Sequence, residues 1–319
     1  MGNEKKSSRN KKLRWLFNKD RAFKGFTAFL ALILLLLVIG ILFKLIFSSR
    51  LSFDAFGFKF IFSSVWDPVK SIFGALPFIW GTFVSATLAL CFALPVSLGI
   101  AIFLSELSPL WMRQPVSFTI DLLAAIPSVI YGFWGLFVLA PVMQIYIEPV
   151  LAKYLGFLPL FKGYPLGVGM LTGSIIVAIM IMPTISSISR EVLATVPTHQ
   201  KEAALAIGMT KWETIWKIML PYGRSGIVAA VILGYGRALG ETMAVTMVIG
   251  NTPQISLSLF DPAYTIASVI ANEFSEATNE LYLSSLVELG LVLFAITLIF
   301  NAFAIFLLWK MKKFEGVRT

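Results

Sequence analysis

Six long apolar runs constrain the fold of this chain more than any other feature of its sequence. A helix needs about 20 mostly apolar residues to cross the hydrocarbon core of a bilayer. Six segments meet this length: Thr27–Phe47, Phe78–Leu104, Ile120–Ile147, Leu166–Ser187, Gly226–Ile249 and Val287–Trp309. Of the 319 residues, 58% are hydrophobic and 13% charged, and the mean hydropathy is +0.85. The composition excludes a cytosolic enzyme or a disordered chain and predicts an all-α integral membrane protein with six transmembrane helices.

The basic residues predict the orientation of these helices. Lys and Arg number 19 in the two terminal tails and in loops 105–119 and 188–225, against 5 in the other three loops. Because basic residues accumulate on the cytoplasmic side of a membrane, we expect both termini in the cytoplasm. The first apolar run is 21 residues long and lacks a small-residue cleavage site, so we interpret it as a retained span rather than a secretory signal. The predicted organisation is a basic tail (1–26), a first helix (27–47), an external loop (48–77), a core (78–309) and a second tail (310–319).

Two of the predicted external segments have their own patterns. Loop 250–286 contains Asp261, Glu273, Glu276 and Glu280 but no Lys or Arg, which fits either a solvated loop or a docking surface for an external partner. In the first external loop, phenylalanines alternate with other residues over 56–62. This period of two predicts a short extended segment at the membrane interface.

Loop 188–225 is too long and too apolar for a simple connector. Gly208 would end a first short helix, since glycine adopts the left-handed conformation at little cost. Thr210 and Glu213 form a capping box that opens a second helix, which Leu220-Pro221 is expected to close. Two short helices with an apolar side suit either insertion into a groove of a partner protein or an interfacial position on the membrane.

A charge occupies the middle of the fifth apolar run. Arg237 lies there, and Glu241 follows four residues later, on the same face if the helix is continuous. A charge at mid-bilayer costs about 2.5–3.5 kcal/mol on insertion scales, so such residues usually have a function. One interpretation is that Arg237 offers a fork of donors to a passing oxyanion while Glu241 limits how tightly the anion is held. The other is an ion pair that only fixes helix packing.

Hydroxyl groups in the spans could also donate to an anion along a pathway, although in membrane helices they more often bond to backbone. The candidates are Ser128, Tyr131 and Thr242, with Thr82 and Ser85 as weaker ones. The chain has a single histidine, His199, and a single cysteine, Cys91. We therefore expect no metal site, no cofactor and no catalytic residue. A Gly-Lys dipeptide is also missing, so the sequence contains no P-loop for nucleotide.

Several motifs resemble those of known transporters. Glu202-Ala203-Ala204, Gly208 and Ile218-x-Leu220-Pro221 match the pattern E-A-A-x3-G-x9-I-x-L-P, and so resemble the EAA loop of ABC importer permeases. The segments 236–245 and 125–132, and Trp66-Asp67-Pro68 followed by Gly81-Thr82, are similar to signatures of ABC phosphate importer permeases, in particular the PstC-type subunit. The resemblance extends from about Trp66 to the C-terminus.

The resemblance implies a type I ABC importer permease fold in a prokaryotic cytoplasmic membrane, and phosphate import driven by ATP hydrolysed on a separate chain. It also implies a second permease of the PstA type, two copies of an ATP-binding subunit and an external phosphate-binding protein. Arg237 and Glu241 would act in translocation, and Glu202, Ala203, Ala204 and Gly208 in coupling to the ATPase. Alternatives are a permease for another oxyanion such as molybdate or sulfate, or the paralogous PstA-type subunit, which shares much of the pattern. An ion-coupled carrier or channel leaves the EAA loop unexplained, and a membrane-embedded enzyme lacks an evident nucleophile and base.

Overall fold

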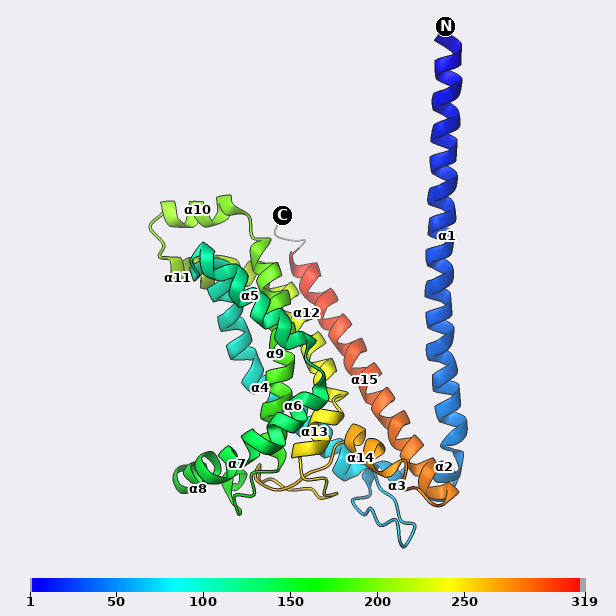
Figure 1. Cartoon of the computed structure of the whole chain (residues 1–319), viewed down its shortest axis with the longest axis vertical. Helices are drawn as coiled ribbons and strands as arrows, with labels where there is room; N and C mark the ends of the chain where they lie inside the picture. Colours follow the sequence, from blue (N-terminus) through cyan, green and yellow to red (C-terminus); the bar gives the residue numbers. More distant parts are fainter. Residues whose placement is uncertain (1, 316–319) are drawn as a thin grey trace.

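The computed structural model describes residues 2–315, and the regular secondary structure in this range is helical, without a β-strand. Side chains are described for residues 23–311. Outside this description lie Met1, residues 316–319, and the side chains of residues 2–22 and 312–315. All of them belong to the two predicted tails. Six helical segments are long and apolar enough to cross a membrane. Figure 1 shows how the helices are arranged. The predicted all-α fold with six spans is confirmed.

The helices alternate between long spans and short connecting segments. In chain order they are α1 (Gly2–Ser48), α2 (Arg50–Phe56), α3 (Lys59–Phe62), α4 (Leu76–Ile102), α5 (Leu110–Ala125), α6 (Ser128–Trp134), α7 (Ala140–Val142), α8 (Glu148–Leu155), α9 (Met170–Ala194), α10 (Thr198–Ala206), α11 (Lys211–Thr214), α12 (Leu220–Leu239), α13 (Met243–Val248), α14 (Ile266–Glu273) and α15 (Glu280–Glu315). Wider π-helical turns cover Phe103–Leu107, Gly135–Leu139, Met143–Ile147 and Ile215–Met219, and a 3₁₀ turn covers Pro159–Phe161. The spanning segments are Phe23–Ser48, Leu76–Leu107, Ser128–Leu155, Met170–Ala194, Lys211–Leu239 and Glu280–Met311.

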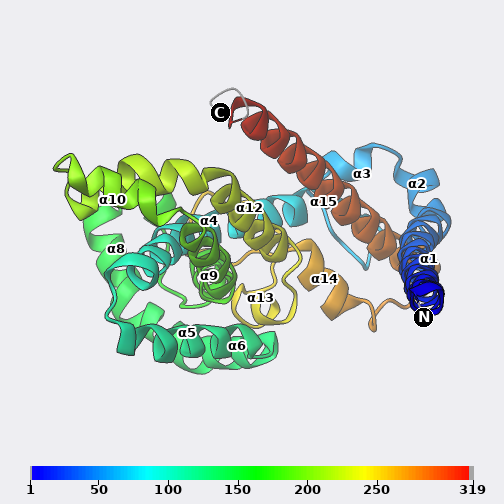
Figure 2. The ribbon, with the colours of Figure 1, turned by 90° about the horizontal axis from the view of Figure 1, so that it is seen from above.

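The core of the molecule is a close packing of α4, α9 and α12 (Figure 2). On α4, Ala86, Ala89 and Ala93 are fully buried, and their spacing of three and four residues places them on one face. Small residues on a membrane helix let the backbone of a neighbour approach closely. Val177 and Ile181 of α9 belong to the same buried cluster. The core therefore depends on shape matching, because apolar surface alone gives no preference for protein over lipid.

The first and last helices lie at the periphery. In α1, the span Phe23–Ser48 has no buried residues in its most apolar stretch. Figure 1 shows α1 standing apart from the bundle over most of its length. Its contacts are with α15 and α2, where Gly290 lies beside Leu45. An apolar helix so exposed is stable only in lipid or against another protein.

The third predicted span is wrong in its boundaries. The helix α5 ends at Ala125, Ile126 and Pro127 are extended, and a new helical segment runs from Ser128 to Leu155. Proline disfavours helical geometry in the residue before it and lacks an N–H group. The apolar run Ile120–Ile147 therefore contains the end of one helix and most of the next.

The boundaries around the fifth span also differ from the expectation. The second helix of loop 188–225 does not close at Leu220-Pro221 but continues through a π-helical turn into α12, giving one spanning segment from Lys211 to Leu239. Pro221 follows shortly after the π-helical turn, so the helix continues past a residue that lacks an N–H group for bonding to the preceding turn. At the other end α12 stops at Leu239, and α13 begins after a short non-helical segment. The predicted single helix Gly226–Ile249 is thus broken.

The predicted extended segment over residues 56–62 is likewise replaced by two short helices. Phe56 ends α2, and Phe60 and Phe62 lie in α3. Gly57 joins the two with a φ of +53°, a value that favours glycine, and Phe60 is fully buried. Burial of one ring on a helical turn therefore explains the phenylalanines better than a strand at the interface.

The connecting elements gather at two opposite ends of the molecule. The N-terminal end of α1 and the C-terminal end of α15 lie on the same side as α10 and α11, whereas α2, α3, α8 and α14 lie on the other (Figure 1). We call these the α10 end and the α14 end. An even number of membrane crossings returns the chain to the side on which it started, so this arrangement agrees with six spans.

Candidate functional site

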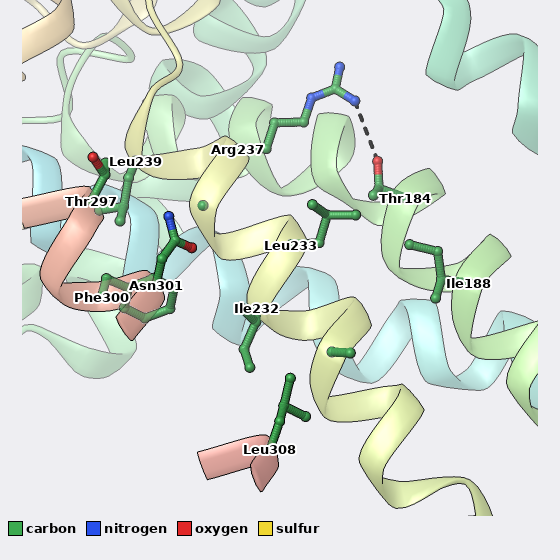
Figure 3. A pocket seen from close by; sticks show the side chains of 12 residues that line it. Thr184, Ile188, Ile232, Leu233, Arg237, Leu239, Thr297, Phe300, Asn301 and Leu308 are labelled. Carbon is green, nitrogen blue, oxygen red and sulfur yellow. Dashed lines mark hydrogen bonds between the residues drawn. The ribbon is translucent and has the colours of Figure 1, made fainter. Parts of the chain in front are cut away.

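Arg237 lies in the last turn of α12 and its side chain is exposed. A cation is favourable at this position because the carbonyl groups of the last helical turn carry partial negative charge. Its Nη1 donates a long hydrogen bond of 3.4 Å to Oγ1 of Thr184 on α9, as Figure 3 shows. The sequence did not point to Thr184, because only the tertiary packing of α9 on α12 brings the two residues together.

Glu241 does not pair with Arg237. It follows Gly240 in the non-helical segment between α12 and α13, and its Oε1 accepts a hydrogen bond of 3.4 Å from the backbone N–H of Ala244. Both residues are described by the structure, and no ion pair joins them. The expected spacing on one helical face is lost because the helix ends two residues before Glu241. The guanidinium therefore has donors left for another group.

A groove with a volume of about 750 Å³ lies beside α12, between α9 and α15. Of the 12 described residues that line it, Arg237 alone is charged; Thr184, Thr297 and Asn301 are polar and the others are apolar or glycine. Figure 3 shows Arg237 and Thr184 on one side of α12 and Asn301 with Thr297 on the other. Asn301 and Thr297 lie inside the sixth apolar run. Because polar residues are uncommon in such a run, their presence could have identified them from the sequence as candidate site residues.

Most of the predicted pathway hydroxyls are engaged with backbone carbonyls. The Tyr131 hydroxyl donates to the Leu123 carbonyl at 2.8 Å, which ties α6 to α5 across the Pro127 break. Thr242 Oγ1 donates to the Gly240 carbonyl at 3.2 Å. Ser128, at the start of α6, is partly exposed and has no hydrogen bond from its side chain within the described residues.

The two weaker candidates lie deep in α4. Thr82 and Ser85 are buried, and each donates its hydroxyl to a carbonyl of the preceding turn. Thr82 also accepts a hydrogen bond from the backbone N–H of Ile266. Their hydroxyls therefore have packing roles. Nor does any group of three His, Cys, Asp or Glu side chains that could hold a metal ion occur in the part of the chain that the structure describes.

At the α10 end, the first of the two predicted short helices forms as α10, and the second begins at α11 but continues into α12. The helix α10 carries Glu202 and Ala203 exposed and Ala204 buried. Gly208 follows with a φ of +88°. Thr210 then caps α11: its Oγ1 accepts from the N–H of Glu213, whose Oε2 accepts from the N–H of Thr210. Exposed Leu205 and Ile207 add an apolar edge to this projecting unit.

At the α14 end, the acidic loop is partly bound into the molecule. Oε2 of Glu273 accepts hydrogen bonds from Trp66 Nε1 at 2.9 Å and from the Tyr282 hydroxyl at 2.6 Å. Asp261 accepts from Ser256 Oγ at 2.5 Å. Two of the four predicted carboxylates thus hold the loop to its own chain, while Glu276 and Glu280 stay exposed. A docking role for this surface stays a prediction.

Comparison with known proteins gives a family and near relatives. Residues 93–313 match the model of the family described as "Binding-protein-dependent transport system inner membrane component". A "Phosphate transport system permease protein PstC" of Pasteurella multocida (strain Pm70) is 47% identical over 298 residues, covering 92% of this chain and 93% of that protein. The protein of the same name from Xylella fastidiosa (strain Temecula1 / ATCC 700964) is 50% identical, covering 91% and 90%.

Among solved structures, the fold is similar to a chain in a bacterial alginate ABC transporter complexed with an alginate pentasaccharide-bound periplasmic protein. The TM-score is 0.55 at 17% identity, over 86% of this chain and 92% of that one. At this identity the likeness concerns the fold alone, which is that of an ABC importer permease.

Proposed function

The chain belongs to the family of binding-protein-dependent transport system inner membrane components, and we propose that it is the permease subunit through which such a system imports inorganic phosphate. The observation that carries this proposal is the identity of nearly one half, over nine-tenths of the chain, to permeases named for phosphate transport. A permease subunit is not itself an enzyme. It works with an ATP-binding subunit, a substrate-binding protein and a second permease.

In more detail, we propose a heterodimer with a permease of the PstA type, two copies of the ATP-binding subunit and an external phosphate-binding protein, in a prokaryotic cytoplasmic membrane. The chain has no Gly-Lys dipeptide and hence no P-loop, so ATP is hydrolysed on the separate subunit. Its docking segment is the α10–α11 unit, in which Glu202, Ala203 and Gly208 are exposed and Ala204 is buried beneath them. ATP-driven closure of the partner moves this unit, and alternating access follows.

The substrate role falls on Arg237. A guanidinium presents several N–H donors in a plane, a geometry that matches the oxygens of phosphate. Its single described hydrogen bond, to Thr184, is long, so exchanging it for a substrate oxygen costs little. Glu241 supplies negative charge a few residues away and keeps the anion from binding too tightly for release. Ser128 and Tyr131 of α6, which packs against α13, and Thr242, which immediately precedes α13, are the candidate hydroxyl contacts.

A permease for another oxyanion is the remaining alternative within this class. Molybdate and sulfate would satisfy the same guanidinium fork, because their oxygens have similar geometry and charge. The names of the relatives favour phosphate and the PstC type over the PstA-type paralogue. Competition between these anions in an uptake assay identifies the one that is transported.

The test is ATP-driven uptake of labelled phosphate into vesicles that contain this chain with its three kinds of partner. We expect uptake that requires ATP and persists in excess unlabelled sulfate or molybdate. If one of these competitors blocked uptake, the assignment as an importer permease would stand, and the proposed substrate would change to the competing anion. Uptake that continues without ATP would contradict the importer class.

A further inference from the structure

One ion pair joins α10 directly to the end of α4. Lys201 Nζ lies 2.5 Å from Glu106 Oε1, and the two side chains are 20% and 24% exposed. Lys201 immediately precedes Glu202, and Glu106 lies in the π-helical turn that extends α4. The other two ion pairs within the described residues, Lys70–Asp67 and Lys217–Glu213, join neighbours on their own segment. The Lys201–Glu106 pair is thus the one that joins distant parts of the chain.

Beyond its chain connections to α9 and α11, α10 has few other attachments. Ala204 is its single buried residue. Two backbone hydrogen bonds, from Met209 to the Ala204 carbonyl and from Gly208 to the Leu205 carbonyl, close the turn after the helix and hold it to its own loop. Without the ion pair, a force on α10 would reach α4 through the chain connections of α10 to α9 and α11, and no side-chain hydrogen bond within the described residues would join α10 to the end of α4 directly.

The helix α4 connects the α10 end with the α14 end. Its 27 residues are about 40 Å long at 1.5 Å per residue. At the far end, Trp80 Nε1 donates to the Ser256 carbonyl at 3.2 Å, and Thr82 Oγ1 accepts from the Ile266 N–H at 3.0 Å. A Cβ added to Gly81 would lie 2.1 Å from the Tyr264 carbonyl oxygen, so backbone meets backbone there. Movement of α4 along its axis must therefore move segment 250–266.

We propose that Lys201 and Glu106 are positioning residues that transmit the movement of α10 to α4, and through α4 to segment 250–266 at the opposite end. The inference rests on the proposed function in one respect: it takes α10 as the helix moved by the ATP-binding subunit. An ion pair suits this task because it joins two specific atoms, whereas apolar attraction is non-directional and lets two surfaces slide past each other.

The experiment uses the assembled complex with Lys201→Gln, Glu106→Gln, and the exchanged pair Lys201→Glu with Glu106→Lys. Phosphate uptake and ATP hydrolysis are measured on the same preparation. We expect each single variant to assemble and hydrolyse ATP while the phosphate imported per ATP falls about fivefold or more, the smallest loss typical of coupled sites. The exchanged pair should regain most of that ratio. Lys70→Gln, which breaks an exposed ion pair at the α14 end, is the matched control and should keep the ratio.

A second readout does not involve phosphate. Leu257 is 62% exposed on segment 250–266, and Leu257→Cys in a Cys91→Ala background can be labelled with a maleimide. We expect nucleotide trapping to change the labelling rate in the unmodified pair and to leave it unchanged with Glu106→Gln. An equal response in both would overturn the inference, as would an unaltered ratio of phosphate to ATP, or an exchanged pair that fails to recover. Absence of phosphate uptake by the wild-type complex would contradict the proposed substrate, while the labelling would still decide the inference.

Discussion

At the scale of single residues, the guanidinium of Arg237 carries the proposed substrate role. Replacing it by Arg237→Gln removes the charge and the fork of donors, and hydrogen bonds to charged groups contribute about 1.5–3 kcal/mol each. We therefore expect phosphate uptake to fall at least about tenfold, with the subunits still co-purifying. Arg237→Lys should be intermediate, because an ammonium keeps the charge but lacks the planar fork.

The matched control is Lys44→Gln. Lys44 is the other basic residue inside a predicted span, and it lies on the exposed helix α1. It should leave uptake near the wild-type rate. Near-normal uptake by Arg237→Gln would mean that the charge only stabilises packing.

At Gly208 the effect of backbone conformation can be separated from the effect of side-chain size. Its φ is +88°, and a Cβ built there meets nothing within 4 Å. The cost of a side chain is therefore conformational, about 1–2 kcal/mol for a residue that avoids the left-handed region. We expect Gly208→Val to weaken co-purification of the ATP-binding subunit and Gly208→Asn to retain it, since asparagine tolerates this conformation. Equal co-purification of the two variants would remove the conformational argument.

The candidate site shows which residues a sequence can identify and which it cannot. Arg237 was evident because an isolated charge in an apolar run is costly to insert into a bilayer and therefore marks a candidate functional position. Thr184 was not, because its relation to Arg237 depends on how α9 and α12 pack. The expected pairing with Glu241 failed for a local reason: the i,i+4 rule assumes a continuous helix, and α12 ends at Leu239.

At the scale of the elements, α4 offers two glycines that test its contact with the α14 end. A Cβ at Gly81 would lie 2.1 Å from the Tyr264 carbonyl oxygen, whereas one at Gly99 would meet nothing within 4 Å. Overpacking against backbone costs about 1–3 kcal/mol, while alanine is favoured over glycine in a helix by about 0.5–1 kcal/mol. Gly81→Ala should lower the thermal unfolding midpoint in detergent, and Gly99→Ala should keep or raise it. Similar unfolding midpoints for the two variants would show that segment 250–266 shifts to accept the added methyl group without a cost in stability.

The prolines explain why the number of spans could be predicted while their ends could not. Pro127 separates two helices, whereas the helical chain continues past Pro95, Pro183 and Pro221. A proline frees a carbonyl, and the helix continues where neighbours or local geometry satisfy that group. This depends on the surrounding helices, which a single sequence does not contain. Total apolar length is a local property, so six spans were evident.

At the scale of the whole molecule, the orientation in the membrane is the prediction that links both ends to their partners. The excess of Lys and Arg in the tails and in loops 105–119 and 188–225 favours the α10 end in the cytoplasm. Val69 at the α14 end is 95% exposed and Ile207 beside α10 is 80% exposed, so cysteines at these positions are accessible reporters. The exposed Cys91 is first replaced by alanine to leave one thiol per variant.

With a membrane-impermeant maleimide, Val69→Cys should react in intact cells, whereas Ile207→Cys should react only after the membrane is permeabilised. Labelling of both variants in permeabilised cells is the control that each thiol is reachable. The reverse pattern would place α10 outside, away from cytoplasmic ATP, and would contradict docking of the ATP-binding subunit at Glu202–Gly208. The orientation therefore determines whether the Lys201–Glu106 link can be driven from inside the cell and whether segment 250–266 can respond on the outside.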